Sequence, residues 1–343
     1  MPDPLEIRTA PPSESGPMAP AGGAWPPIAA ALLAFALIAL ATRLAPRPML
    51  IADRFWPGTG WLEAGLIAVY AGFVMRAMRT PEGARKTRPR IWRLFTVVFF
   101  GQLLLGLLGF ERFLMSGQLH LPVPALIVAG PIYRGGGYFM VALFLSTIVL
   151  VGPAWCSHLC YIGAWDDTAS RARKTPQPLP KWRPKARLAI LIAVVAAALA
   201  LRVGGASPAT AAWVGAGFGL IGVGIMLTAS RRTGAMAHCT TWCPVGLAAN
   251  ILGKLNPFRL RIGEGCTECR VCTRACRYEA LTLDDIRRRM PGLSCTLCGD
   301  CLASCRHRQL HYRFPGLSPD AARTLFLVLV VGLHAAFLAL ARI

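Results

Sequence analysis

Long apolar runs separated by short polar segments form the main pattern along this chain. Each run is close to the ~20 residues that an α-helix needs to cross the hydrocarbon core of a bilayer. The runs cover residues 28–44, 61–78, 91–110, 138–155, 186–203, 209–229 and 321–341. The pattern therefore predicts a mainly α-helical protein with about seven transmembrane helices.

Basic residues are concentrated in two of the polar segments. One cluster, which includes Lys86 and Arg88, follows the second apolar run, and another, which includes Arg171 and Lys185, follows the fourth. Loops rich in Lys and Arg stay on the cytoplasmic side of a membrane. We therefore expect a multi-pass protein of the bacterial cytoplasmic (inner) membrane with its N-terminus inside, residues 204–208 outside and Ile343 outside.

The composition agrees with a membrane protein. Hydrophobic residues make up 55% of the 343 residues and charged residues only 15%, which is too apolar for an ordinary soluble domain. The net charge of +21 is carried by short basic runs beside apolar stretches, where such residues set topology and contact anionic lipid. Membrane lipid, and not nucleic acid, is the expected partner of this charge.

The polar parts of the chain divide it into four regions. Residues 1–24 are rich in Pro, Ala, Gly and Ser and are predicted to be a disordered tail. A transmembrane domain is expected over residues 25–255, a cysteine-rich domain over 256–316 and a last transmembrane helix over 317–343. Within the loop 111–137, the apolar piece 121–132 is too short to span a bilayer, so it either lies along the interface, re-enters or simply connects.

The cysteine-rich domain contains the motif C-x2-C-x2-C-x3-C twice. In bacterial two-cluster ferredoxins the first three cysteines of each run bind one [4Fe-4S] cluster, and the fourth binds the other cluster. We therefore expect a small α+β domain of this type, and the spacing assigns its ligands in two sets of four. These sets are Cys266, Cys269, Cys272 and Cys305 for the first cluster, and Cys295, Cys298, Cys301 and Cys276 for the second.

Structural zinc is the alternative to iron–sulfur clusters at these cysteines. Zinc sites use C-x2-C pairs separated by a spacer and do not need a third or fourth cysteine at these offsets, so the pattern favours iron–sulfur. The residue after the fourth cysteine is usually Pro, but here it is Arg277 in one run and Arg306 in the other. The local turn is expected to differ there without loss of a ligand.

The remaining four cysteines form two C-x3-C pairs. Cys156 and Cys160 follow the fourth apolar run, Cys239 and Cys243 follow the sixth, and each pair precedes a glycine. This arrangement indicates an internal repeat at the cytoplasmic edge of the membrane. Positions i and i+4 share a helical face, so each pair presents two thiols side by side.

Several interpretations of these pairs remain open. Facing pairs would make a four-thiolate site for a metal or a further iron–sulfur centre, whereas each pair alone would cycle between dithiol and disulfide. Cysteines that simply pack between helices are the structural alternative. His158 and His238 flank the pairs and are candidates for extra ligands or for proton acceptors near a quinone headgroup.

The combination of motifs resembles the NapH, MauN and NosR group of membrane polyferredoxins, with CcoG a more distant relative. The resemblance covers roughly residues 138–314 and rests on the segment 238–244 and the eight ferredoxin cysteines. Tyr161 departs from it, because the family usually has Pro at that place. NosR-like proteins also carry a large outer flavin-binding domain, for which these 343 residues have no room, so NapH and MauN are the better comparison.

The resemblance implies electron transfer between the membrane quinol pool and a partner redox protein through the clusters. A maturation factor that supplies electrons, metal or disulfides to a partner metalloenzyme is the alternative. Nothing in the sequence resembles a substrate pocket or an activated nucleophile, so no self-contained substrate chemistry is expected beyond quinol oxidation.

Overall fold

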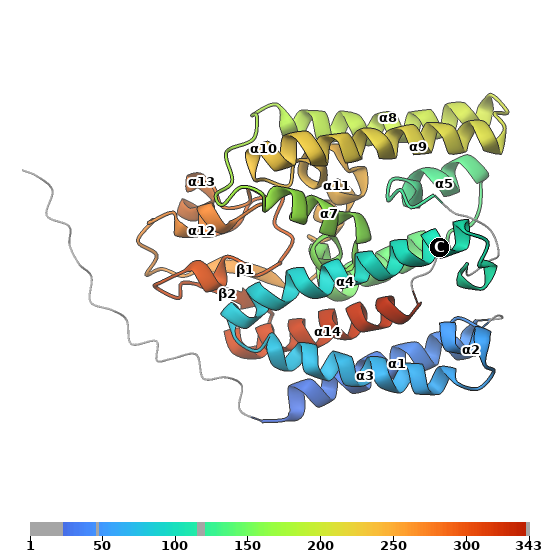
Figure 1. Cartoon of the computed structure of the whole chain (residues 1–343). Helices are drawn as coiled ribbons and strands as arrows, with labels where there is room; N and C mark the ends of the chain where they lie inside the picture. The colour runs from blue at the N-terminus through green and yellow to red at the C-terminus, as the bar shows by residue number, and fades with distance from the viewer. Residues whose placement is uncertain (1–22, 46–47, 115–120, 341–343) are drawn as a thin grey trace, which may run out of the picture.

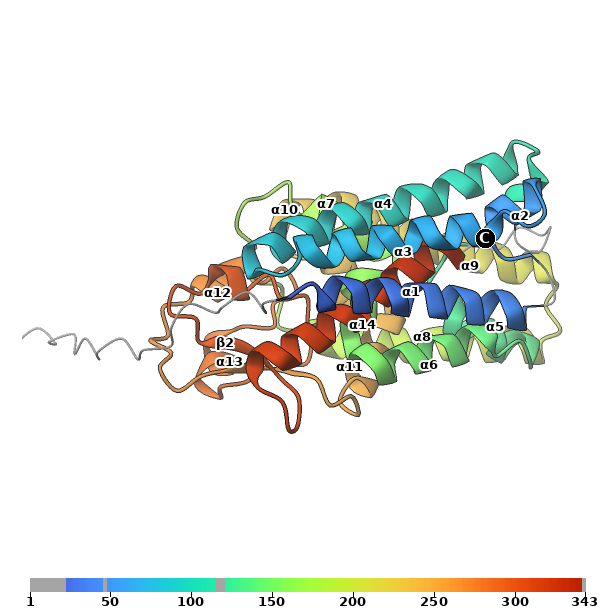
Figure 2. The same cartoon turned by 90° about the horizontal axis from the view of Figure 1, so that it is seen from below.

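The computed structural model describes residues 23–45, 48–114 and 121–340. Long helices run side by side, and the cysteine-rich part of the chain forms a head at one end of them (Figure 1). Figure 2, turned by 90°, shows the head at the same end of the helices. Nearly all of the predicted tail 1–24 lies outside the described residues, as does Ile343.

Six helical stretches are long and apolar enough to cross a membrane. They are α1 (Trp25–Leu44), α4 (Pro81–Leu107), the stretch Phe139–Leu159, α8 (Arg183–Val203), the stretch Pro208–Thr233 and α14 (Pro319–Leu340). The remaining predicted span is a helix as well, α3 (Gly60–Ala77), but it has only 18 residues and carries Glu63 and Arg76. These two charged side chains reduce its apolar character, and it is not among the six.

Helix α14 lies at the centre of the helical bundle. Other parts of the protein bury 72% of the apolar 18-residue stretch of α14, compared with 17% of that of α1 and 11% of that of α8. It packs against α1, α3 and the strand β2 of the head. The last predicted span is therefore part of the core that joins the head to the other helices.

Helices α8 and α9 (Pro208–Ile225) form a hairpin whose outer faces are exposed and apolar. Among the exposed side chains are Ile192 on α8 and Trp213 and Leu220 on α9. Such faces suit contact with lipid chains. The short helix α5 (Leu126–Arg134) packs against α8, and the Tyr133 hydroxyl donates to the carbonyl of Ala206 at 2.7 Å. The predicted apolar piece 121–132 therefore largely forms a helix at the end of the bundle opposite the head.

Two of the spanning stretches end in breaks from α-helical geometry. Helix α6 (Phe139–Val151) continues through the 3-10 turn η2 (Gly152–Ala154) into the π-helical turn η3 (Trp155–Leu159), followed by α7 (Tyr161–Ser170). Helix α9 continues through η4 (Met226–Ser230) and α10 (Arg231–Thr233) to the π-helical turn η5 (His238–Trp242), followed by α11 (Pro244–Leu252). π-Helical turns occur frequently at functional sites.

The head contains a two-stranded antiparallel sheet, in which β1 (Arg259–Ile262) pairs with β2 (Leu310–Arg313) and Leu260 lies opposite Tyr312. The short helices α12 (Val271–Ala275), α13 (Leu283–Arg287) and η6 (Leu302–Ser304) connect the strands. Tyr312 stacks on Phe326 of α14 with ring centroids 4.8 Å apart. The core of the head is therefore continuous with that of the helical bundle. The two other short helices, α2 (Ile51–Phe55) and η1 (Glu111–Phe113), lie at the opposite end.

Candidate metal centres

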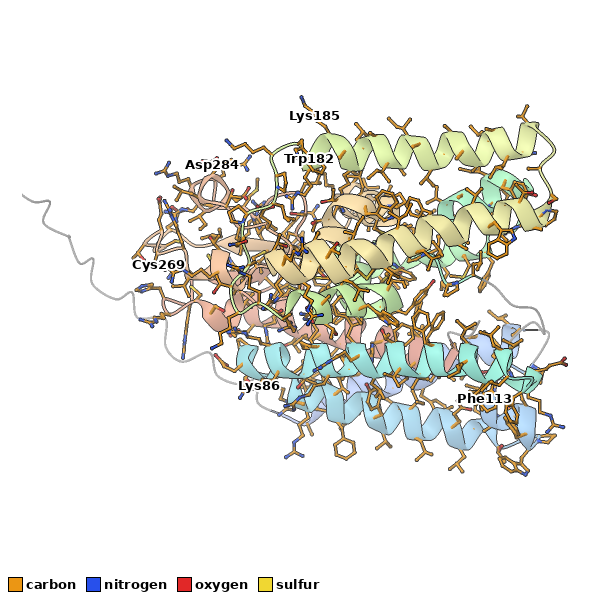
Figure 3. The ribbon with its side chains drawn as sticks, turned by 45° about the horizontal axis from the view of Figure 1, so that its top comes forward. Lys86, Phe113, Trp182, Lys185, Cys269 and Asp284 are labelled. Carbon is orange, nitrogen blue, oxygen red and sulfur yellow. The ribbon has the colours of Figure 1, made fainter. Side chains whose placement is uncertain are left out.

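Four cysteines of the head line one pocket, which we call the distal group: Cys266, Cys269, Cys272 and Cys305. The buried side chains of Ile262, Ile286 and Leu310 form part of its wall. Cys269 is exposed, and it lies at the tip of the head (Figure 3). The structure thus brings together the four residues that the spacing assigns to one cluster, and their role as ligands remains a prediction.

The other four cysteines of the head form a second set, the inner group: Cys276, Cys295, Cys298 and Cys301. Burial raises the pKa of Cys301 well above its usual value, and the neighbouring thiolates of Cys298, Cys276 and Cys295 raise it further. Cys272 of the distal group acts on Cys301 in the same direction. The crosswise sets expected from the sequence are therefore gathered in space, and the two groups are neighbours.

The two cysteine runs repeat the same unusual backbone. Glu268 and Leu297, each just before the second cysteine of its run, have φ of 53° and 55°. Arg270 and Gly299, each just after it, have φ of 57° and 78°. Non-glycine residues in this region are strained, and such strain persists where a site demands it. The matching strain indicates that both runs wrap their backbone around the same kind of centre.

Backbone amides point at the sulfur atoms of both runs. The amide of Ala280 donates to Cys276 Sγ and the amide of Gln309 donates to Cys305 Sγ, each at 3.3 Å. Hydrogen bonds to the sulfurs are among the factors that set the potential of an iron–sulfur cluster. Burial also raises the pKa of Cys276, Cys295 and Cys298 to about 12, so the free thiols are neutral and a metal must displace their protons.

The two C-x3-C pairs have the same local structure. Cys156 lies in the π-helical turn η3, and Cys160 is the residue before α7 with φ −80° and ψ 116°. Cys239 lies in η5, and Cys243 is the residue before α11 with φ −75° and ψ 115°. The internal repeat predicted from the sequence is therefore present in the fold.

The four cysteines of these pairs lie together, and we call them the edge group: Cys156, Cys160, Cys239 and Cys243. Burial raises the pKa of Cys239 well above its usual value, and the nearby charges of Asp166, Cys243, Cys160 and Cys156 raise it further. All four side chains are thus within electrostatic reach of one another. Facing pairs were one of the arrangements that the sequence left open, and the structure brings the two pairs together.

Two buried charged residues adjoin the edge group. Asp166 is fully buried, and one of its carboxylate oxygens accepts a hydrogen bond from the amide of Cys239 at 2.9 Å. Arg187 is 6% exposed and donates to the carbonyl of Cys239 at 3.4 Å. Sequence reasoning missed both residues. Each is a charged residue beside an apolar run, but charged residues at such places commonly serve only to orient a helix in the membrane.

Tyr278 connects the edge group to the inner group. Its hydroxyl donates to the carbonyl of Cys156 at 3.2 Å, and its ring is 4% exposed. It belongs to a small buried cluster against which Cys239, Cys276 and Cys298 pack. The three groups of cysteines therefore form a series from the end of the helices, through the inner group, to the exposed Cys269.

The two flanking histidines face helices. The ring of His158 lies edge-on to Phe326 of α14, and its Nδ1 is 3.0 Å from the Ser157 hydroxyl. The ring of His238 packs against Gly222 of α9. Their role as extra ligands or as proton acceptors stays a prediction.

The state of the thiols bears on the alternatives left open by the sequence. All twelve cysteines are free in the described structure. Among the described residues, no three Cys, His, Asp or Glu side chains are close enough together to hold a single metal ion.

Comparison with known proteins gives one family match. A protein family described as a 4Fe-4S binding domain matches residues 133–180 and 215–263. Each matched segment contains one C-x3-C pair, and the eight-cysteine stretch follows the second segment. No curated protein and no solved structure matches the chain. The family match, together with six helices that are long and apolar enough to span a membrane, fits a membrane ferredoxin.

Proposed function

We propose that this protein is a membrane electron carrier of the NapH and MauN type, which relays electrons between the quinol pool and a partner redox protein. The distal and inner groups of cysteines would each hold one [4Fe-4S] cluster. The observation that carries the proposal is the series of cysteine groups, which runs from the ends of the spanning helices to the exposed Cys269.

The residues of both groups suit such clusters. Each group offers four thiols, backbone amides that donate to sulfur, and the crosswise ligand order of two-cluster ferredoxins. When bound, the clusters supply one-electron storage. The chain places the two groups beside each other, buries Cys301 of the inner group and leaves Cys269 of the distal group exposed to a partner.

The position of the basic residues supports a cytoplasmic head. Lys86 on α4 and Lys185 on α8 lie at the head end of their helices, whereas Phe113 lies at the opposite end (Figure 3). Basic residues mark the cytoplasmic side of a membrane protein. Helix α3 runs alongside α1 (Figure 1) and would be the seventh span, because it must return the chain to the head side before α4 begins.

A polar contact within the bundle is the candidate proton path for quinol oxidation. His334 Nδ1 is 3.1 Å from the carbonyl of His158, and a carbonyl only accepts, so Nδ1 carries the hydrogen. In the neutral ring Nε2 is then an acceptor, and the Tyr70 hydroxyl donates to it at 3.2 Å. The Tyr70 oxygen thus keeps lone pairs for a quinol hydroxyl arriving at α3, where Leu66 and Phe73 are exposed.

The balance of the proposed reaction is simple. A quinol that is oxidised to quinone releases two electrons and two protons. The two electrons would leave one at a time, through the clusters that the cysteine groups would hold, and would reduce an oxidised partner. The first proton would pass from the quinol to Tyr70 as Tyr70 passes its own proton to His334. It would return through Tyr70 to solvent once the quinone has left, and the second proton would be released to solvent directly.

The tip of the head is suited to an acidic partner. Arg270, Arg274, Arg306 and Arg308 are exposed around the distal pocket. Glu264 is exposed nearby, whereas Glu268 is paired with Arg287 at 3.4 Å. Complementary charge steers association and fixes orientation. Arg277, the residue after Cys276, does not belong to this surface, because its guanidinium donates to the carbonyls of Ser170 and Gly234.

The maturation factor remains the second candidate function. In that role the partly exposed thiols of the edge group, Cys160 and Cys239, would supply metal or disulfides to the client. The two functions are separated by turnover: a relay reduces many equivalents of acceptor per protein, whereas a maturation factor acts once on each client.

The experiment uses the full chain, purified anaerobically in detergent and mixed with a reduced short-chain quinol. Bleaching of the iron–sulfur absorbance, followed by repeated turnover when an oxidised acceptor dye is added, is expected. Reduction by dithionite without any reduction by quinol would contradict the relay.

A further inference from the structure

We propose that the edge group, Cys156, Cys160, Cys239 and Cys243, binds a third [4Fe-4S] cluster at the boundary between the helical bundle and the head. The inference extends the proposed function but does not depend on it, because the content of clusters can be measured without any electron donor.

The first argument is the symmetry of the two segments that contain the C-x3-C pairs. Each contributes one cysteine from a π-helical turn and one from the residue before the next helix, with nearly equal backbone angles at Cys160 and Cys243. A side chain at Gly163 would come within 2.9 Å of the carbonyl of Cys156, and one at Gly246 within 2.9 Å of the carbonyl of Cys239. Both turns thus require glycine at the same place.

The second argument is the donor set around the sulfurs. The amides of Ile162 and Gly163 donate to Cys160, and those of Val245 and Gly246 donate to Cys243. These amides belong to the first turns of α7 and α11, helices of ten and nine residues. Helix N-termini favour negative charge, and a cluster with four thiolate ligands carries net negative charge. The guanidinium of Arg187, whose Nε has no partner, adds a positive charge beside it.

The third argument concerns disulfide exchange. Thiol exchange requires a thiolate that is accessible to its partner. Cys156 and Cys243, one thiol of each pair, are buried. An exchange partner therefore cannot reach either of these two thiols. The match of the 4Fe-4S binding family to the two segments that contain these pairs also favours an iron–sulfur centre over a redox disulfide.

The test is the iron and acid-labile sulfide content of the full chain after anaerobic reconstitution. Three clusters require about 12 iron atoms and 12 sulfides per chain, whereas the two ferredoxin clusters alone require about 8 of each. About 10 would indicate a [2Fe-2S] centre and would overturn the assignment. About 8 iron atoms and 8 sulfides, together with one bound zinc or with a disulfide in each C-x3-C pair, would overturn it as well.

Variants locate the third cluster. Cys239→Ser with Cys243→Ser is expected to lower the count to about 8, with the paired ferredoxin clusters still visible by EPR as proof that the head has folded. Thr241→Ser lies in the same turn and serves as the control that keeps about 12. An unchanged count in the double variant would contradict the proposal. The cluster count is measured without quinol, so it tests this proposal even if the protein is not reduced by quinol.

Discussion

Arg88 of helix α4 and Asp300 of the head form a buried bidentate ion pair, with Arg88 nitrogens 2.7 and 3.0 Å from the two carboxylate oxygens. Arg88 is 1% exposed, and it also donates to the carbonyl of Ser157, the neighbour of Cys156, at 3.1 Å. Asp300 lies between two cysteines of the inner group. One side chain from a transmembrane helix therefore connects the edge group and the inner group.

Replacement of Arg88 should separate the head from the bundle. Arg88→Gln removes the buried one of the two cations that Asp300 and Asp167 share, while Arg171 stays paired with both carboxylates. A loss of about 1.5–3 kcal/mol is expected, the usual worth of a hydrogen bond to a charged group. The expected result is a lower temperature for loss of the iron–sulfur absorbance on heating. Arg88→Lys keeps the charge but not the bidentate geometry, so a smaller loss is expected. Equal stability of Arg88→Gln and the native protein would contradict a joining role.

Arg277 explains the departure from the usual Cys-Pro sequence. Its guanidinium donates to the carbonyls of Ser170 and Gly234, each at 2.7 Å, and to that of Arg173 at 3.2 Å. Arg277→Pro should therefore lower stability by about 2–4 kcal/mol, since hydrogen bonds from charged donors are worth more than neutral ones. Hydrogen exchange at residues 170–174 and 234 is expected to increase.

Arg306→Pro is the matched control for this variant. Arg306 occupies the equivalent place after the fourth cysteine of the second run, but it is exposed. A small effect, within about 0.5 kcal/mol, is expected for such a surface change. If both variants behaved alike, the contacts of Arg277 would not be the reason for arginine at this position.

Tyr70→Phe tests the proposed proton path. The variant keeps the ring but removes the hydroxyl that links His334 to the lipid-facing side of α3. Reduction by quinol is expected to slow by about 10²–10⁴-fold, as for loss of a positioned proton-transfer group. Reduction by dithionite should keep its native rate. A native rate with quinol would place quinol oxidation elsewhere in the bundle.

Charge reversal at the tip of the head tests the docking surface. Arg270→Glu with Arg306→Glu should slow electron transfer to an acidic flavodoxin by about 10-fold or more at low ionic strength, and the difference should shrink with added salt. A small neutral acceptor dye should react at the native rate with the variant. Lys86→Glu, on the membrane side of the head, provides the control. Equal slowing by both variants would argue against a localised site.

Most of the fold followed from the sequence because its signals are local. Apolar runs define spanning helices, and the spacing of the eight head cysteines predicted the two sets that the structure gathers. The central place of α14 could not be predicted in this way, because hydropathy reports whether a helix is apolar but not whether lipid or protein covers it. His334 is a visible irregularity in that helix, yet its partner Tyr70 belongs to a distant segment.

The edge group shows the same limit. Its C-x3-C spacing predicted two pairs of thiols side by side, but spacing does not show whether the pairs meet or what they bind. Asp166, Arg187 and Tyr278 reach the group from three separate segments, and no local pattern distinguishes them from ordinary residues at the end of an apolar run. The contacts of Arg277 could not be predicted either, because a sequence does not show which basic residues face solvent.

The most direct test of the relay is the order in which its cysteine groups are reduced. Native protein and the variants Cys243→Ser and Cys272→Ser would be mixed anaerobically with a quinol, frozen at intervals and measured by EPR. Cys272→Ser should still accept electrons from quinol into its remaining centres but fail to reduce an acidic partner. Cys243→Ser should retain reduction by dithionite and lose reduction by quinol. Fast reduction of the ferredoxin clusters by quinol in Cys243→Ser would contradict a path that begins at the edge group.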